Sequence, residues 1–182
     1  GKHCKILFHQ TWAYAQNCRN SGFKKYGSNQ MEMYRSIVET VKKAGKLVKF
    51  YRVVPSGTAI QNARTSFIGD YMNRDGSHLD IGVGRYTVAC TWFEVLTGKS
   101  VLGNAFIPKN ISSEYAEIAQ RAAHEAVRHP DKVTDLSDIK DRSLYKNPAF
   151  SIDRRVDDLL ARMNLEEKIY QLNQYTLGRN NN

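Results

Sequence analysis

Two apolar runs separated by one long amphipathic segment constrain the fold of this chain more than any other feature. Residues 5–9 and 47–54 are apolar and have the length of strands. Between them, Asn29 can cap a helix with Glu32 as its capping-box partner, and apolar positions recur at helical spacing until Gly45 offers a C-cap. A strand, a helix and a second strand connected in this way predict two parallel strands with a right-handed crossover. The expected fold class is α/β, with a three-layer α/β/α arrangement.

Further helices are expected after the second strand, which Pro55 ends. A short helix fits residues 59–64, and apolar residues at helical spacing predict a longer one that ends near Gly98. Ser112 can cap the next helix, and residues 101–107 before it form either a short edge strand or an extended loop. Three aromatic residues are expected in the core: Tyr86, Trp92 and Phe93.

The chain is expected to have three parts. With 182 residues, of which 41% are hydrophobic, it is long enough for one globular domain and an appendage. A polar, charged segment with little periodicity is typical of a linker, and after it Ser151 and Asn164 can each begin a short helix. We therefore expect a domain over residues 1–128, a linker over residues 129–150, and the first helices of another domain over residues 151–182.

The motif with the most chemical information is a turn in which Asp75 stands three residues before His78. In a Ser-His-Asp site the carboxylate accepts the Nδ1–H of the imidazole, so that Nε2 is free to take a proton from the serine. Because Asp75-Gly76 favours a turn, Asp75 and His78 are our candidate catalytic residues. The spacing alone is common, so an ordinary surface turn is the alternative interpretation.

Two more groups of candidates follow the predicted strands. His9, Gln10 and Trp12 stand where the first strand ends, and Ser56 and Gly57 stand just after the second. Ligands of open α/β sheets bind at the carboxyl ends of strands, so these five residues are candidates for substrate binding. Backbone N–H groups at such a helix start can also bind an anion. Ser56 is the serine placed most plausibly as a nucleophile, but its surroundings lack the Gly-x-Ser-x-Gly elbow.

No metal or cofactor site is expected. His124-Glu125 and His129 resemble part of a zinc-protease motif, but the histidines are five residues apart instead of four. At about 100° per residue, that spacing turns them roughly 140° apart on a helix, so they are predicted to be surface residues. The chain has no Cys-x-x-Cys pair, and its three cysteines are expected to be buried free thiols: Cys4, Cys18 and Cys90.

Positive charge is concentrated in the first third of the chain. The net charge is +9, and residues 1–52 carry eleven basic side chains against two acidic ones, Glu32 and Glu39. A non-catalytic basic module that binds nucleic acid or an anionic polysaccharide is therefore the alternative function. A solvated face rich in lysine is the simpler interpretation, and nucleic acid is an unfavoured partner. No apolar run approaches the length of a membrane span, and no signal peptide is visible.

The residues around these candidates are similar to a known enzyme family. Residues 7–14 (LFHQTWAY), 54–68 (VPSGTAIQNARTSFI) and 73–79 (NRDGSHL) resemble the C-terminal half of bacterial SGNH-type hydrolases, in a family long catalogued as a domain of unknown function. The resemblance implies a three-layer, flavodoxin-like ester hydrolase of a kind that often acts on acetylated carbohydrates. It also implies that Asp75 orients His78, the general base. The serine nucleophile of that family lies in Gly-Asp-Ser or Gly-Asn-Ser near its N-terminus, and this chain contains neither.

A second resemblance covers the end of the chain. Residues 154–179 are similar to the first helices of glycoside hydrolase family 3, the β-glucosidase and β-xylosidase group, whose catalytic residues lie far downstream. Both ends of the chain look cut, so we expect a fragment of a bifunctional enzyme in which a glycan esterase precedes a glycosidase. The implied substrate is an acylated glycan, and the implied location is secreted or periplasmic. Without its serine, the fragment is expected to be inert as an esterase.

Overall fold

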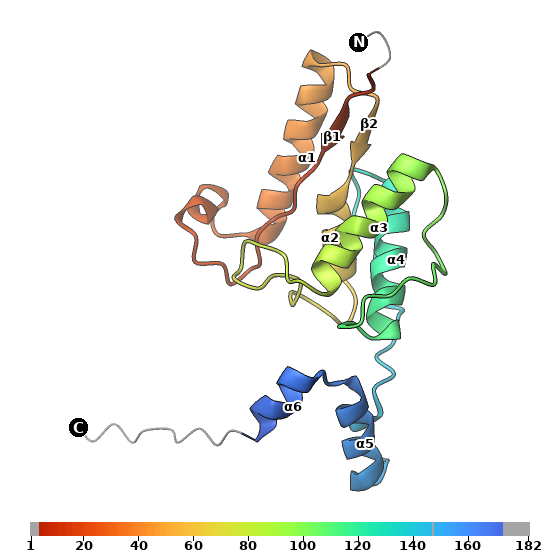
Figure 1. Cartoon of the computed structure of the whole chain (residues 1–182). Helices are drawn as coiled ribbons and strands as arrows, with labels where there is room; N and C mark the ends of the chain where they lie inside the picture. Colours follow the sequence, from red (N-terminus) through yellow and green to blue (C-terminus); the bar gives the residue numbers. More distant parts are fainter. Residues whose placement is uncertain (1–3, 147, 173–182) are drawn as a thin grey trace, which may run out of the picture. The chain divides into compact units, whose positions relative to one another are not determined.

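The computed structural model describes residues 4–146 and 148–172 of the chain (Figure 1). These residues belong to two compact units, residues 1–141 and residues 142–182. Within the described part of the chain, no helix combines the length and the apolar character that crossing a membrane requires.

A small parallel sheet organises the first unit. Strand β1 (Leu7–His9) pairs with strand β2 (Arg52–Val54), and the register places His9 opposite Val54. The prediction of two parallel strands joined through a helix is confirmed, and the fold is α/β. Both strands are shorter than predicted. The side chains of β1 are half-buried, because β2 is its one strand neighbour among the described residues.

Helix α1 (Gln30–Leu47) connects the strands and begins where the sequence predicts. The Asn29 side chain accepts a hydrogen bond from Glu32 N, so the predicted N-cap is confirmed. The capping box is not completed, because the Asn29 N–H donates to Tyr26 O and the Glu32 carboxylate pairs with Arg35. Tyr26 ends a short 3-10 helix, η1 (Ser21–Tyr26).

The predicted end of this helix at Gly45 is wrong. α1 continues to Leu47, where the Val48 N–H donates to Ala44 O. A Cβ on Gly45 would lie 3.1 Å from the ring of Phe50, so the glycine gives that ring room against the helix. The first residues of the predicted second strand are therefore part of the helix and of the loop that carries Phe50.

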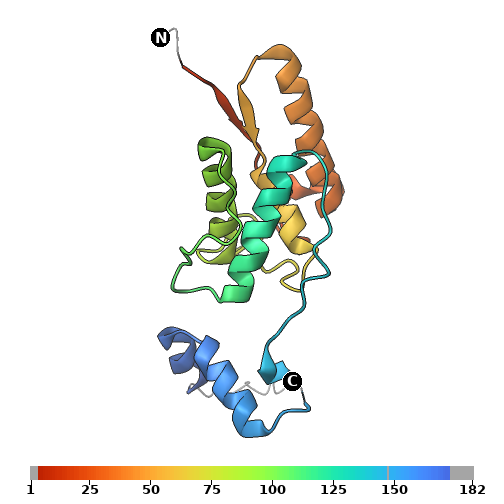
Figure 2. The same ribbon diagram turned by 90° about the vertical axis from the view of Figure 1, so that its right-hand side faces the viewer.

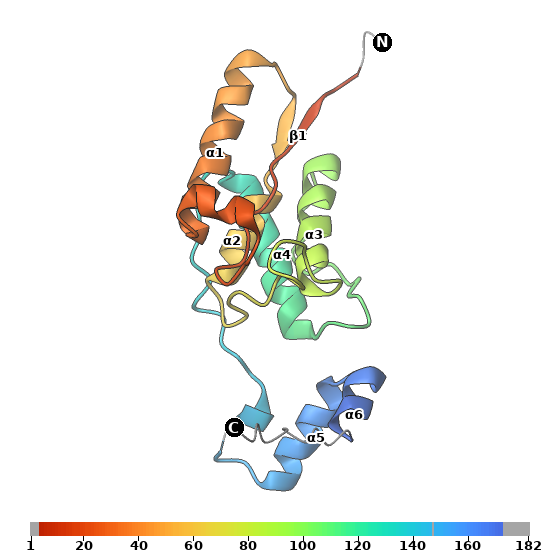
Figure 3. The same cartoon turned by 90° about the vertical axis from the view of Figure 1, so that its left-hand side faces the viewer.

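Three further helices build the main core. Helix α2 (Ser56–Arg64) follows β2 directly, α3 (Val83–Thr97) ends at the predicted Gly98, and α4 (Ser113–Arg128) begins at the predicted cap Ser112. Figures 2 and 3 show α1 and α3 on opposite sides of the strand pair. Residues 101–107 form a loop between α3 and α4. The buried cluster of these helices includes Ile60, Met72, Tyr86, Cys90, Ile118 and Leu136.

The linker predicted over residues 129–150 begins later than expected. Leu136 is fully buried in the core cluster. The side chains of Asn62 and Thr65 accept hydrogen bonds of 2.7 Å from backbone N–H groups of this segment. Residues 130–141 therefore belong to the first unit, because they supply partners for polar side chains at the end of α2.

In its described part, the second unit contains the short helices η2 (Leu144–Lys146), α5 (Ile152–Arg162) and α6 (Leu165–Gln171). The predicted caps Ser151 and Asn164 are confirmed, and Asn164 also forms a capping box with Glu167. Residues 173–179, the last part of the segment that resembles a glycosidase, lie outside the described residues. Several large apolar side chains of this unit are exposed: Ile152, Leu165, Ile169 and Leu172.

Candidate functional site

The turn at Asp75 and His78 has the geometry that the sequence predicts. Asp75 Oδ2 lies 2.8 Å from His78 Nδ1, and Asp75 Oδ1 accepts hydrogen bonds from the N–H groups of His78 and Ser77, at 2.7 and 3.0 Å. These hydrogen bonds, with the His78 N–H first, hold the pKa of the Asp75 carboxyl below its ordinary value. The carboxylate is therefore ionised at neutral pH. The side chains of His78 and Asp75 are 67% and 47% exposed, so the pair reaches solvent.

The turn is held against the segment that follows β1. Gly76 has a φ of +83°, which glycine adopts without strain, and its carbonyl accepts a hydrogen bond of 2.7 Å from Ala15 N. Ser77 O accepts a hydrogen bond of 2.9 Å from Trp12 Nε1. The position of the Asp-His pair is thus set by the loop at the carboxyl end of β1.

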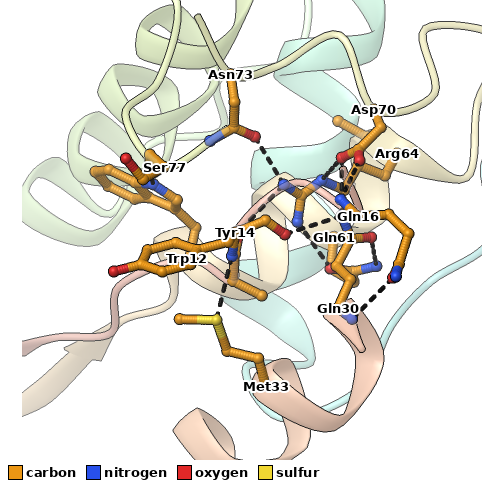
Figure 4. Close-up of polar contacts among 12 residues, drawn as sticks. Trp12, Tyr14, Gln16, Gln30, Met33, Gln61, Arg64, Asp70, Asn73 and Ser77 are labelled. Carbon is orange, nitrogen blue, oxygen red and sulfur yellow. Dashed lines mark hydrogen bonds and ion pairs between the residues drawn. The ribbon is translucent and has the colours of Figure 1, made fainter. Parts of the chain in front are cut away.

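A buried arginine joins this turn to the helices (Figure 4). Arg64, the last residue of α2, donates from Nη2 to Asn73 Oδ1 at 2.8 Å and to Ala13 O at 3.1 Å. Asn73 in turn pairs with Leu79 in an antiparallel bridge at the base of the Asp-His turn. Arg64 therefore contacts both the loop after β1 and the segment that leads into the turn.

Asp70 compensates the charge of Arg64. Arg64 Nε lies 2.9 Å from Asp70 Oδ1, and the arginine side chain is only 4% exposed. Asp70 also accepts hydrogen bonds from Gln16 N and Gln30 Nε2, at 2.6 and 2.8 Å. Burial lowers the pKa of Arg64 to about 10, which still leaves the guanidinium charged at neutral pH. One polar network therefore connects α1, α2 and the two loops that meet at the turn.

A cavity of about 370 Å³ opens beside His78. Its lining includes Trp12, Trp92, Arg74, Arg85 and His78. With His78 Nδ1 bonded to Asp75, Nε2 has no hydrogen-bond partner among the described residues and is the nitrogen left to act on a ligand. Trp92 was predicted to lie in the core, but it is half-buried and lines this cavity because its face of α3 is open.

His9 and Ser56 meet at the carboxyl ends of the two strands. His9 Nε2 lies 2.9 Å from Ser56 Oγ, and the His9 ring lies 5.2 Å from the Trp92 ring and 6.4 Å from the Trp12 ring, between centroids. Burial lowers the pKa of His9, so its imidazole is neutral at neutral pH. Ser56 is fully buried, which does not suit a nucleophile. His9, which Ser56 contacts, thus lies against both tryptophans of the cavity.

Gln10 and Gly57, which were predicted to contact substrate, both make close contacts within the fold. The Gln10 side chain is buried, and its Oε1 accepts hydrogen bonds of 3.0 Å from both the N–H and the hydroxyl of Thr58. Gly57 N donates to Gln10 O, and a Cβ on Gly57 would lie only 2.0 Å from Thr11 O. The N–H groups of Gly57 and Thr58 are therefore occupied by the end of β1, and the anion site predicted there is not formed by them.

His124 is not the surface residue that the spacing predicts. Its Nδ1 lies 2.7 Å from Glu94 Oε1, and the two side chains are 20% and 9% exposed. Glu94 Oε2 also accepts a hydrogen bond from Val101 N, so the pair joins α3, α4 and the loop between them. His129 is exposed, as predicted. In the described stretches of the chain, no group of three or more His, Cys, Asp or Glu side chains is arranged to hold a metal ion.

The cysteines differ in environment, which corrects the expectation of three buried thiols. Cys90 is buried in the core, Cys18 is half-buried beside the Asp-His turn, and Cys4 is exposed. Cys18 packs closely there because Gly76 has no Cβ. A Cβ at that position would lie 3.0 to 3.2 Å from the α-carbon and side chain of Cys18. Cys4 precedes β1, where it has no core to enter.

One acidic side chain from outside residues 1–52 neutralises part of the basic excess of that segment. Lys42 Nζ lies 3.1 Å from Asp131 Oδ2 and 3.6 Å from Glu39 Oε1, and Arg35 pairs with Glu32. Asp131 comes from the segment that was predicted to be a linker. The Lys42–Asp131 pair therefore reduces the positive charge that a nucleic-acid-binding function would use.

Sequence reasoning missed three arginines of this site. Arg64 looks like an ordinary basic residue at a helix end, and no local pattern reveals its burial. Arg85 carried a usable signal, because it stands three residues before Val88 and seven before Trp92, on one face of the predicted helix. Arg74 is adjacent to Asp75 and could have been included with the turn.

The comparisons with known proteins agree on one family. Residues 1–126 match the model of a domain of unknown function, DUF4886. The chain is 58% identical to a DUF4886 family protein from Bacteroides uniformis ATCC 8492, whose crystal structure aligns with a TM-score of 0.75 over 77% of this chain and 54% of that chain. This chain thus spans about half the length of that protein. No curated protein matches it. Since the family model covers more than half of the sequence, the chain belongs to the DUF4886 family.

Proposed function

We propose that residues 1–141 carry the acid–base part of an SGNH-type ester hydrolase that acts on acylated glycans. The observation that carries this proposal is the 2.8 Å contact between His78 Nδ1 and Asp75 Oδ2, beside a cavity that His78 lines. A carboxylate that binds Nδ1–H fixes the tautomer in which Nε2 is a free base. The resemblance of residues 73–79 to the last motif of SGNH hydrolases supports the same assignment.

In this mechanism, His78 Nε2 accepts the proton of a serine hydroxyl as the serine attacks the ester carbonyl. His78 then gives the proton to the alcohol oxygen of the leaving sugar, and it next accepts a proton from the water that attacks the acyl-serine and returns it to the serine as the acid leaves. Asp75 stays ionised throughout, because its pKa is held below the ordinary value, and it stabilises the imidazolium that forms.

The nucleophile of this reaction is proposed to lie outside the described residues. Ser56 is buried and bonded to His9. Ser77 Oγ contacts Asp75 Oδ1 and lies beside His78 Nδ1, whereas a serine activated by His78 would lie beside Nε2. The related crystal structure comes from a chain of which this one covers 54%. We place the serine in the additional sequence of such a longer protein, in a Gly-Asp-Ser or Gly-Asn-Ser motif.

Residues 142–182 are proposed to begin a family 3 glycosidase domain. The resemblance of residues 154–179 supports this, and so does the exposure of apolar side chains on α5 and α6, which suits helices that belong to a larger domain. An esterase that removes acyl groups and a glycosidase that trims the same glycan form a consistent pair. A secreted or periplasmic location is part of this proposal.

The proposal is tested by the reading frame upstream of Gly1. It should encode Gly-Asp-Ser or Gly-Asn-Ser at the end of an apolar strand, and the protein expressed from it should hydrolyse an activated acetyl ester and an acetylated xylan. His78→Ala should then lower kcat/KM by about 10³-fold or more. His129→Ala is the matched control, because it removes another exposed histidine far from Asp75 in sequence. Unchanged turnover in the His78→Ala protein would overturn the proposal.

A further inference from the structure

Two arginines stand at the cavity beside His78. Arg85 lies on α3 and Arg74 directly precedes Asp75, and both contribute to the lining. Arg85 shares one face of α3 with Val88 and Trp92, which are three and seven residues further along. The cavity therefore combines a cationic part with an apolar, aromatic wall.

Among the described residues, the one ion-pair contact of these two arginines is long. Arg74 Nε lies 3.9 Å from Asp75 Oδ2, at the limit of an ion pair, and Asp75 is already bound to His78. Both oxygens of Asp80 accept hydrogen bonds of 2.6 Å, from Gly82 N and Gly84 N. Among the described residues, Arg85 has no carboxylate partner. A ligand with an anionic group would supply one.

The aromatic wall suits a sugar ring. Trp12 and Trp92 both line the cavity, and each packs against the His9 ring, which keeps the two indoles on a common support. Trp12 is also fixed by its hydrogen bond to Ser77 O. The flat, apolar face of a sugar packs against such rings, while its polar edge stays free for charged partners.

We propose that this cavity binds an anionic sugar, a carboxylate- or sulfate-bearing unit of the glycan, with Arg85 and Arg74 on the anionic group and Trp12 and Trp92 on the ring. The proposal rests on the proposed function in one respect, since it makes this sugar part of the ester substrate. Binding of the anionic group would select among glycans, which the Asp-His pair alone does not do. Arg85 is the main determinant, because Arg74 shares its charge with Asp75.

Intrinsic fluorescence of the full 182-residue chain gives a direct test. The chain contains two tryptophans, Trp12 and Trp92, and both line the cavity. Three probes of equal length are titrated: a neutral xylo-oligosaccharide, one that carries glucuronic acid, and one that carries sulfate. The expected result is a fluorescence change at lower concentration with an acidic probe, and the better of the two acidic probes identifies the anion.

Variants locate the effect. Arg85→Gln should raise the Kd of the acidic probe about tenfold and leave that of the neutral probe unchanged. Arg35→Gln removes an exposed arginine from α1, outside the cavity, and should leave both constants unchanged. Equal binding of acidic and neutral probes, an equal effect of the two substitutions, or no response to any probe would overturn the anionic-sugar proposal. The esterase proposal is decided separately by the His78→Ala activity test, because these binding measurements involve no turnover.

Discussion

Trp12 Nε1 donates a hydrogen bond of 2.9 Å to Ser77 O, across 65 positions of sequence. Trp12 lies just after β1, and Ser77 stands between the two members of the Asp-His pair. The indole therefore has two functions at once, since one edge fixes the turn and its ring lines the cavity.

Replacing Trp12 by Phe should loosen the turn while keeping an aromatic ring in place. Loss of this hydrogen bond should cost about 1 kcal/mol in the free energy of unfolding, measured by urea denaturation. Amide exchange at Ser77 and His78 should also become faster. Trp92→Phe is the control, because Trp92 contacts His9 but holds no part of the turn. Faster exchange at the turn in both variants alike would contradict this role for Trp12.

Asp75→Asn should change the tautomer of His78. An amide in this position can still accept the turn hydrogen bonds, but it has no charge and presents an NH₂ group toward the imidazole. The ¹⁵N shifts of the His78 ring should show loss of the Nδ1–H tautomer. Asp135→Asn is a matched control, because Asp135 accepts the same kind of hydrogen bonds from Ser137 without a histidine after it. A tautomer unchanged in Asp75→Asn would contradict the proposed orientation.

The same carboxylate predicts a dependence of stability on pH. The pKa of Asp75 is lower in the folded chain than in the unfolded chain, so its contribution is fully present above the unfolded value, about 4. It is lost as the pH falls through the folded value. The difference in melting temperature between the natural chain and Asp75→Asn should thus be constant from pH 5 to 7 and shrink below about pH 4. A difference that grows toward acid pH would contradict this sign.

Arg64 should be the most sensitive charged residue of the first unit. Arg64→Met removes the ion-pair partner of Asp70 and the donor to Asn73 Oδ1 and the Ala13 carbonyl, so the free energy of unfolding should fall by about 3 kcal/mol. Arg35→Met, which removes an exposed ion pair, should cost less than about 1 kcal/mol. Adding Asp70→Asn to Arg64→Met should restore part of the loss. Equal losses in the two arginine variants would contradict the proposed role of the network.

The three cysteines should react at very different rates. Cys4 is exposed, whereas Cys90 is buried, and burial raises the pKa of its thiol to about 11. At pH 8, iodoacetamide should therefore modify Cys4 first and Cys90 last, because the thiolate is the reacting form. Mass spectrometry of timed samples gives the order, and all three should react in denaturant. Early modification of Cys90 in the native chain would contradict its burial.

Features that depend on neighbouring residues were predictable from the sequence. The caps at Asn29, Ser112 and Asn164 are confirmed because a capping side chain bonds to an N–H only a few residues away. The Asp75-His78 contact likewise needs one turn. The parallel pairing of β1 and β2 followed from the length of the connection between them.

Features that depend on distant partners were not predictable in this way. Arg64 is buried because Ala13, Asp70 and Asn73 converge on it, and none of these residues signals the others in sequence. Residues 130–141 look like a linker by composition, but Leu136 enters a core formed by α2 and α4. The Gln10 side chain accepts a hydrogen bond from Thr58 N at the start of α2, and no local pattern connects these two residues either.

The two oxygens of the Asp75 carboxylate have different hydrogen-bond partners. Oδ1 holds the backbone of the turn, through Ser77 and His78, and Oδ2 alone meets the imidazole. Removing the His78 ring therefore leaves the turn with all of its backbone hydrogen bonds. The backbone of the turn and the orientation of the imidazole are therefore separable at this position, so a descendant of this domain can exchange His78 through a single codon and keep the same turn.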